Sequence, residues 1–176
     1  MKITQEKIVD AALDVAGERG LSNLTMKDIA AQLGIKTPSL YNHVASLGEV
    51  RELLTQRALI ELTEVMKDAA LGLSGKEALY AMAYKYRGFA LRHPSLYDSV
   101  QWVGRSKSEK TSELSEKFLQ IFEKILAPFS LTFEKKIQII RVLRSYLHGF
   151  VVLDFEVDVD VEESFEYGLR LIIEHL

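Results

Sequence analysis

The chain has 176 residues, a net charge of −3 and no cysteine. Its length and its hydrophobic content of 48% suffice for a real core, either in one large domain or in a small domain fused to a larger one. The lack of cysteine excludes disulfides, thiolate catalysis and cysteine-ligated metal sites. No apolar run approaches the roughly 20 residues that span a bilayer, and the N-terminus lacks the apolar core of a signal peptide. We therefore expect a soluble, cytoplasmic protein that does not interact with a membrane.

A first helix is expected over residues 4–19. Ile8, Ala12 and Val15 recur on one face at helical spacing, and charged residues occupy the opposite face. Gly20 suits the position that ends a helix, because glycine readily takes the positive φ needed there.

The segment LTMKDIAAQLGIKTPSLYNHVASL, residues 24–47, is predicted to form two short helices joined by a tight turn. Thr25 is a suitable N-cap for the first helix, and Gly34 supplies positive φ where that helix stops. Thr37 and Pro38 then begin the second helix as its N-cap and first position. A small residue at the helix crossing, a glycine in the turn and a polar, aromatic second helix are typical of a helix-turn-helix.

The remaining chain predicts further helices and no sheet. They are expected over residues 48–70, 76–92, 94–103, 112–126, 132–155 and 162–176, with a mobile polar loop over 104–111. The run DFEVDVD, residues 154–160, alternates apolar and acidic residues like a short strand, but its place between two helices favours a turn. The predicted fold class is all-α with about nine helices. Residues 1–47 form a three-helix DNA-binding domain in this prediction, and residues 48–176 form a helical bundle.

The order Thr-x-x-x-Ile-Ala-x-x-Leu-Gly-Ile-x-x-Pro-Ser-Leu-Tyr-x-His-Val, residues 25–44, closely resembles the N-terminal DNA-binding domain of TetR/AcrR-family transcriptional regulators. The run from Leu40 to His43 carries most of this resemblance. A weaker resemblance lies in residues 89–97, 147–153 and 164–169, which are similar to the TetR-family C-terminal domain named for its Trp-His-Gly motif. Leu147 stands at the place of that tryptophan.

The resemblance implies DNA contacts at matched positions. Residues 37–39 match positions that meet base edges or thymine methyl groups in the major groove, whereas Tyr41 and His43 match positions that hydrogen-bond phosphates. Lys27 matches a cation that reaches a base or the backbone. Asn42 fits both a bidentate contact to adenine and a solvated helix face, and both interpretations stay open. The candidate DNA-binding residues are Thr25, Lys27, Lys36, Thr37, Pro38, Ser39, Tyr41, Asn42 and His43.

The charge of the proposed DNA-binding domain is unusual. Residues 1–50 hold 5 basic and 6 acidic residues, whereas nonspecific DNA binding depends on a basic surface. Family members commonly have a phosphate-binding lysine at the position of Leu47, and Lys36 is the nearest partial replacement here. We therefore expect normal specific binding, weak nonspecific binding and a salt slope that is lower by about 1 per half-site.

Aromatic residues of the C-terminal half form a candidate effector pocket. The resemblance implies a small effector, apolar or aromatic, in this half. Each aromatic residue taken alone is more often core than ligand contact, so packed core and pocket wall stay open as interpretations. The candidate ligand-binding residues are Tyr84, Phe89, His93, Tyr97, Trp102, Phe118, Phe122, Tyr146 and Phe150.

Enzymatic and metal-binding interpretations find little support. The chain has no Glu-x-x-His pair of a di-iron bundle, no His-Glu-x-x-His motif and no glycine-rich phosphate loop. Its histidines, at positions 43, 93, 148 and 175, share no ligand spacing. We expect no catalytic residue, no metal site and no cofactor.

The sequence thus predicts a homodimeric DNA-binding regulator, a repressor that a small molecule releases from a palindromic double-stranded DNA operator. The last two helices, residues 132–154 and 161–176, are expected to form the dimer interface. The helix over 48–70 is expected to transmit the effector's influence to the reading heads. The alternative is a helical protein–protein or adaptor module with a degenerate helix-turn-helix, which the acidic head and Leu47 favour.

Overall fold

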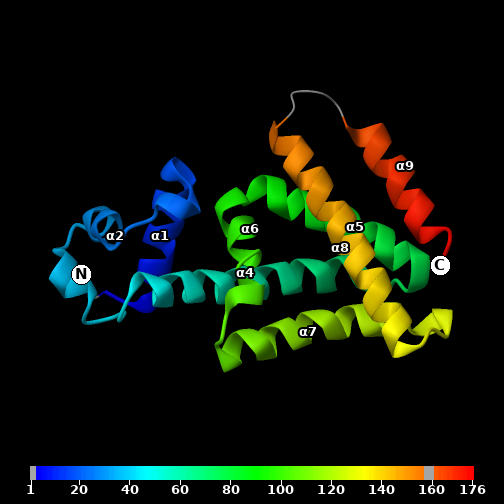
Figure 1. Ribbon diagram of the computed structural model, residues 1–176, viewed down its shortest axis with the longest axis horizontal. Helices are drawn as coiled ribbons and strands as arrows, with labels where there is room; N and C mark the ends of the chain where they lie inside the picture. The colour runs from blue at the N-terminus through cyan, green and yellow to red at the C-terminus, as the bar shows by residue number, and fades with distance from the viewer. Residues whose placement is uncertain (1–2, 157–160) are drawn as a thin grey trace. The chain divides into compact units, whose positions relative to one another are not determined.

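The computed structural model describes residues 3–156 and 161–176. Within them the predicted all-α fold is confirmed, with nine α-helices, three short 3₁₀-helices and no strand (Figure 1). The α-helices are α1 (Gln5–Arg19), α2 (Met26–Gln32), α3 (Thr37–Leu40), α4 (Leu47–Ala70), α5 (Gly75–Arg92), α6 (Pro94–Val100), α7 (Glu109–Ile125), α8 (Phe133–Glu156) and α9 (Glu162–Ile173). The 3₁₀-helices are η1 (Leu21–Asn23), η2 (Val103–Arg105) and η3 (Ala127–Phe129). None of these described helices is both long and apolar enough to cross a membrane.

Two expected segments differ from the observed ones. The polar segment 104–111 is not one loop, because η2 covers its start and α7 already begins at Glu109. Thr111 is buried and hydrogen-bonds Glu52, which explains why this polar sequence is helical. Of the run predicted as a turn over 154–160, residues 154–156 end α8, and 157–160 lie outside the described residues.

Packing divides the chain into two compact units. We call Met1–Ile60 together with His93–Ser115 the head unit, and Glu61–Arg92 together with Glu116–Leu176 the bundle unit. The helix α4 contributes its first part to the head unit and its last part to the bundle unit. The predicted boundary between residues 47 and 48 stays a prediction about function, since the packing boundary falls elsewhere.

The head unit has a core that its helices build together. Ile8 of α1, Ile29 of α2, Leu40 of α3 and Leu54 of α4 are all fully buried in it. The partly buried Trp102, which follows α6, also packs against this core. The helix-turn-helix therefore shares its core with residues from the first half of α4 and from the region after α6.

The helix α6 belongs to the head unit because it packs on α1 and η1. Gly17 of α1 faces Ser95 of α6, and a Cβ added at Gly17 would lie 3.9 Å from the Ser95 hydroxyl oxygen. Pro94 begins α6 at a first-turn position, where its missing N–H removes no hydrogen bond. Leu96 and Val100 are buried on the side that packs.

The bundle unit is organised around α5, which packs against α8, α9 and η3 (Figure 1). The helix α9 also packs against α8. Phe165, Leu169 and Ile173 recur at helical spacing on α9 and are fully buried. Phe89 of α5 is buried as well, so the interior of this unit is closely packed with apolar side chains.

Arg87 of α5 connects the end of α8 to the start of α9. Its Nε and Nη2 atoms donate to the two Asp154 carboxylate oxygens at 2.6 and 2.7 Å, and its Nη1 atom donates to Glu162. The guanidinium carbon also lies 4.6 Å from the centre of the Phe165 ring. The hydrogen bonds that Arg87 donates to Asp154 raise the pKa of Arg87, so this cation stays charged at any ordinary pH. The two predicted dimer helices are thereby held to α5.

Candidate functional site

The first helix of the helix-turn-helix is capped as predicted. The Thr25 hydroxyl oxygen accepts the Asp28 backbone N–H at 3.2 Å, and its hydroxyl donates to the Asp28 carboxylate at 2.5 Å. Arg19 pairs with the same carboxylate at 2.8 Å. Two neighbouring groups thus hold Asp28 at the helix N-terminus, where a negative charge is favourable. Thr25 is exposed, but its side chain is already engaged in this cap.

The turn forms at the expected glycine. Gly34 has φ +67°, a conformation that glycine adopts without strain, and Ile35 N–H then bonds to the Ala30 carbonyl at 3.0 Å. The second helix starts one residue earlier than predicted, because Lys36 is its N-cap and Thr37 lies inside its first turn. Lys36 makes no side-chain cap hydrogen bond, so its exposed ammonium group is not used by the helix end.

Helical hydrogen bonding continues beyond the end of α3, as far as Val44. We call residues 37–44 the reading helix. His43 N–H and Val44 N–H both bond to the Leu40 carbonyl, at 3.0 and 3.2 Å. Leu40 and Val44 are buried and fasten this segment to the head core, while Tyr41 is 51% exposed. The candidate DNA-binding residues therefore lie on one continuous stretch from Thr25 to His43, all exposed except the partly buried Thr37.

The division of roles between these side chains stays a prediction. Ser39 presents a short neutral donor and acceptor, which suits base edges, whereas Tyr41 and His43 present longer polar groups, which suit phosphates. For Asn42 a base contact and a solvated helix face both stay open. The cations on this stretch are Lys27 and Lys36. Specific residue roles in DNA binding stay predictions.

The start of α4 carries a feature that the sequence analysis missed. Ser46 and Glu49 form a variant of the capping box: Glu49 N–H bonds to the Ser46 hydroxyl oxygen at 3.2 Å, but the Glu49 carboxylate accepts the N–H of Ala45, at 2.6 Å, in place of that of Ser46. The S-x-x-E spacing is a readable signal for it. Leu47 lies inside this box and packs partly buried against the head core. The position at which the family resemblance leads us to expect a lysine is thus apolar and lies between the two residues of this cap.

The predicted ligand-binding aromatics do not form one group within either unit. His93, Tyr97 and Trp102 belong to the head unit, and the other six belong to the bundle unit. Phe89 and Tyr97 are among the largest fully buried side chains, and Phe122 is buried as well. Phe118 stacks edge-on against Phe122 at a ring distance of 5.4 Å. The packed-core interpretation accordingly fits Phe89, Tyr97 and Phe122.

Three of the predicted ligand-binding aromatics do lie together, around Phe165, which was not among the predicted residues. The rings of Tyr84, Tyr146 and Phe150 lie 5.4, 6.0 and 5.5 Å from the ring of Phe165. The Tyr146 hydroxyl donates to the Phe165 carbonyl at 2.6 Å. Phe165 was missed because its position on the apolar face of α9 looks like ordinary core. Burial raises the pKa of both Tyr84 and Tyr146, so both phenols are neutral at physiological pH.

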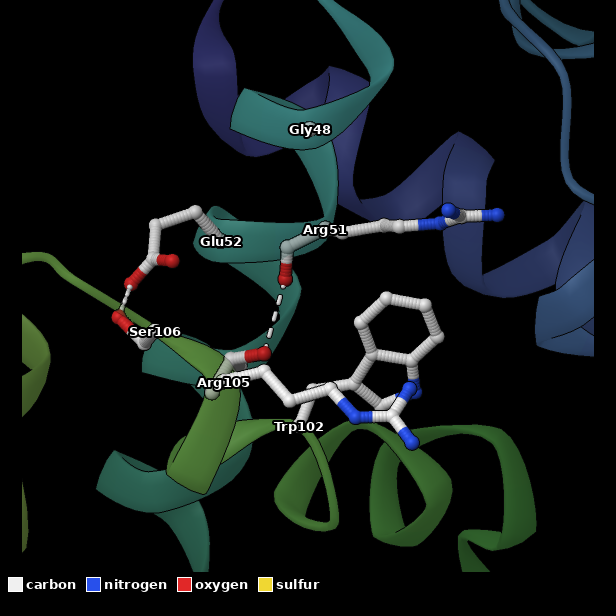
Figure 2. A pocket seen from close by; sticks show the side chains of 7 residues that line it. Gly48, Arg51, Glu52, Trp102, Arg105 and Ser106 are labelled. Atoms are coloured by element: carbon white, nitrogen blue, oxygen red, sulfur yellow. Dashed lines mark hydrogen bonds between the residues drawn. The ribbon is translucent and has the colours of Figure 1, made fainter.

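A pocket of about 210 Å³ lies inside the head unit, between the start of α4 and the segment after α6 (Figure 2). Its lining residues are Gly48, Arg51, Glu52, Thr55, Trp102, Arg105 and Ser106. Trp102 alone among them belongs to the predicted ligand set. Sequence reasoning missed the two arginines, because an arginine on an amphipathic helix or in a polar segment reads as solvated surface.

Comparison with known proteins agrees with this architecture. Residues 8–46 match the model of the bacterial regulatory proteins of the tetR family, and residues 79–172 match the tetracyclin repressor-like C-terminal domain. An uncharacterized HTH-type transcriptional regulator of Bacillus subtilis, YobS, is 31% identical over 99% of this chain and 93% of its own. The tetracycline repressor protein class D of Escherichia coli is 32% identical over 52% of this chain and 42% of its own.

Solved structures show the same fold. The crystal structure of a single-residue TetR variant from Acinetobacter baumannii, in complex with minocycline, superposes with a TM-score of 0.72 at 18% identity and covers 99% of this chain and 96% of its own. The helix-turn-helix geometry, the two family matches and the relative from Bacillus subtilis agree with one another. The chain therefore belongs to the TetR family of DNA-binding transcriptional regulators.

Proposed function

We propose that this protein is a homodimeric repressor that binds a palindromic DNA operator and leaves it when a small molecule binds. The observation that carries the proposal is the exposed polar face of the reading segment. Ser39, Tyr41 and His43 project from a stretch that Leu40 and Val44 fasten to the core. A face of this kind, behind a glycine turn, suits insertion into the major groove.

Dimerisation is supported by apolar side chains that the bundle unit leaves exposed. They lie on the two predicted dimer helices: Val142, Val152, Leu153 and Phe155 on α8, and Tyr167 and Leu171 on α9. Exposed apolar patches of this kind are typical of protein interfaces. Light scattering at micromolar concentration is expected to give the mass of a dimer, and a monomer there would contradict the dimer proposal.

Release by an effector is supported by resemblance and by chemistry. The Acinetobacter relative is described in complex with minocycline, and another relative is a tetracycline repressor. In this chain the ring cluster of Tyr84, Tyr146, Phe150 and Phe165 supplies aromatic surface in the half of the chain where the family binds effectors. An effector acts only through its different affinities for the DNA-binding and the released state, and α4 is the proposed connection between them.

A gel shift with the DNA that flanks the protein's own gene tests the repressor proposal. We expect a discrete complex at nanomolar protein that an unlabelled scrambled duplex does not displace. The adaptor alternative rests on the acidic balance of residues 1–50 and on the apolar Leu47. The adaptor alternative would be favoured if the protein is folded and dimeric but forms no discrete complex with any flanking DNA segment.

A further inference from the structure

The pocket in the head unit has a cationic character that nothing in the reading helix explains. Its lining includes two guanidinium groups, from Arg51 and Arg105, and one carboxylate, from Glu52. Glu52 already accepts hydrogen bonds from the hydroxyls of Ser106, at 2.7 Å, and of Thr111. Among the described residues neither arginine has a carboxylate partner within ion-pair distance. With two arginines and one glutamate, the charged side chains that line the pocket therefore sum to a formal charge of +1.

The two arginines are held in place by one aromatic ring. Figure 2 shows Trp102 between the side chains of Arg51, from α4, and Arg105, from the segment after α6. The guanidinium carbons lie 4.8 and 5.2 Å from the ring centre. A guanidinium in a cation–π contact with a ring still has N–H donors that can bond an anion.

Arg51 also has an unused donor inside the protein. Its Nε atom is buried and makes no hydrogen bond to any described residue. Its Nη2 atom reaches the Ser22 carbonyl only at 3.5 Å, at the limit of a hydrogen bond. Buried donors are nearly always paired, so the Arg51 side chain would gain a hydrogen bond by shifting toward an acceptor bound in the pocket.

We propose that this pocket binds a small organic anion, a carboxylate on a short apolar or aromatic body. Arg51 and Arg105 would hold the carboxylate, since guanidinium groups match its geometry with paired hydrogen bonds. The indole edge and the Thr55 side chain would contact the body. A cavity of roughly 150 Å³ holds benzene, so a pocket of about 210 Å³ has room for a single-ring acid.

The position of the pocket connects it to DNA binding. Gly48 and Arg51 lie in the first turns of α4, directly after the reading helix, and Trp102 packs on the core that holds Leu40. Arg51 also approaches Ser22 in η1. An anion that draws Arg51 toward the pocket therefore changes the contacts that fix the reading helix, and operator affinity falls. This coupling, unlike the binding itself, rests on the proposed function.

Binding is measured by calorimetry and by the fluorescence of Trp102, the only tryptophan of the chain. The probe is benzoate, and benzamide is the uncharged control of the same shape. We expect saturable benzoate binding and no benzamide binding. Arg105→Gln and Arg51→Gln should each weaken benzoate by about ten-fold or more, since each loses a charge-assisted hydrogen bond. Lys107→Gln removes the same charge from the same exposed segment without touching the pocket, and should leave binding unchanged.

The binding proposal is overturned by any of three results: equal affinity for benzoate and benzamide, full benzoate affinity in Arg105→Gln, or no saturable binding of benzoate, phenylacetate or butyrate at millimolar concentration. Arg105 is exposed, so its variant is expected to fold even if Arg51→Gln does not. Circular dichroism of each variant checks this.

Fluorescence anisotropy with labelled operator DNA tests the coupling. Benzoate should weaken the operator affinity of the wild type and of Lys107→Gln, but not of Arg105→Gln. If benzoate saturates the protein and operator affinity does not change, the coupling is wrong and the repressor proposal stands. If benzoate binds and no DNA sequence does, the proposed function fails and the anion pocket stands.

Discussion

Arg87 on α5 and Asp154 near the end of α8 form a two-fold hydrogen-bonded ion pair whose side chains are only 11% and 10% exposed. A pair this well shielded from water behaves differently from a surface pair. Each charge depends on the other, because water cannot replace a lost partner. The stability of the α8–α9 pair therefore depends on Arg87 of α5.

Replacing Arg87 by Met should lower the free energy of unfolding by about 3 kcal/mol, because it leaves Asp154 as a buried, unpaired carboxylate. Urea unfolding at one fixed protein concentration measures this. The matched control is Lys67→Met, which breaks the exposed pair with Glu64 and should cost no more than about 0.5 kcal/mol. Equal losses in the two variants would contradict the role given to burial.

Gly168 of α9 has no room for a side chain. A Cβ added there would lie 2.6 Å from the Tyr146 hydroxyl oxygen, which is itself bonded to the Phe165 carbonyl. Gly168→Ala should therefore destabilise the fold by roughly 1–3 kcal/mol through overpacking. Gly88→Ala, also in a helix, meets only the end of the Arg92 side chain at 3.8 Å and should stabilise by about 0.5–1 kcal/mol. Thermal unfolding of both variants checks the opposite signs.

The partly buried phenol of Tyr146 makes stability depend on alkaline pH. Burial raises the pKa of Tyr146 above its ordinary value of 10.0. The unfolded chain therefore loses this proton first, so the stability contribution is complete below pH 10 and is lost as pH rises through the folded-state pKa. The free energy of unfolding should fall above pH 10. In Tyr146→Phe that fall should be shallower, and an unchanged slope would show that the phenol stays solvated.

Tyr41 and Ser39 should affect DNA binding differently. Tyr41→Phe removes one hydroxyl expected at a phosphate, so it should weaken operator and scrambled duplex by a similar factor, at most about ten-fold. Ser39→Ala should change the preference at one base position and leave the scrambled duplex unaffected. Anisotropy against a panel of operator variants separates the two. Identical binding profiles would refute the assigned roles.

Glu49 offers a change of charge at the DNA-binding head with little structural cost. Glu49→Gln keeps an oxygen that can accept the Ala45 N–H, because glutamine also closes a capping box. It removes a negative charge two residues from Leu47, the position at which the family resemblance leads us to expect a cation. DNA affinity should rise at low salt and converge with the wild type at high salt, since salt screens exposed charges. A salt titration measures this, with an unchanged melting temperature as the control.

The features predicted correctly depend on interactions between residues that are close in sequence. The Thr25 cap, the Gly34 turn and the buried Leu40 each depend on neighbours within a few residues, and the all-α fold follows from their periodicity. The start of α3 was placed one residue late because Thr37 and Lys36 both permit an N-cap and only the backbone decides between them.

What escaped prediction depends on contacts between distant parts of the chain. Nothing in the sequence pattern of α6 indicates that it packs on α1 rather than in the bundle, so the discontinuous head unit could not be predicted. Arg51 is likewise far in sequence from Trp102 and Arg105, so the pocket that they line could not be predicted. The nine aromatic candidates were chosen by residue type, which cannot distinguish the filled interior around Phe89 from the cluster around Phe165.

The packing of α6 on α1 has a practical meaning for protein engineers. Hybrid regulators are often imagined as one protein's N-terminal reader exchanged onto another protein's sensor. In this chain a transplant that ends at residue 60 would leave behind residues 93–115, which cover α1 and η1. A working graft must carry both segments, or redesign the apolar surface that the second one covers. The natural module for recombination is thus discontinuous in sequence.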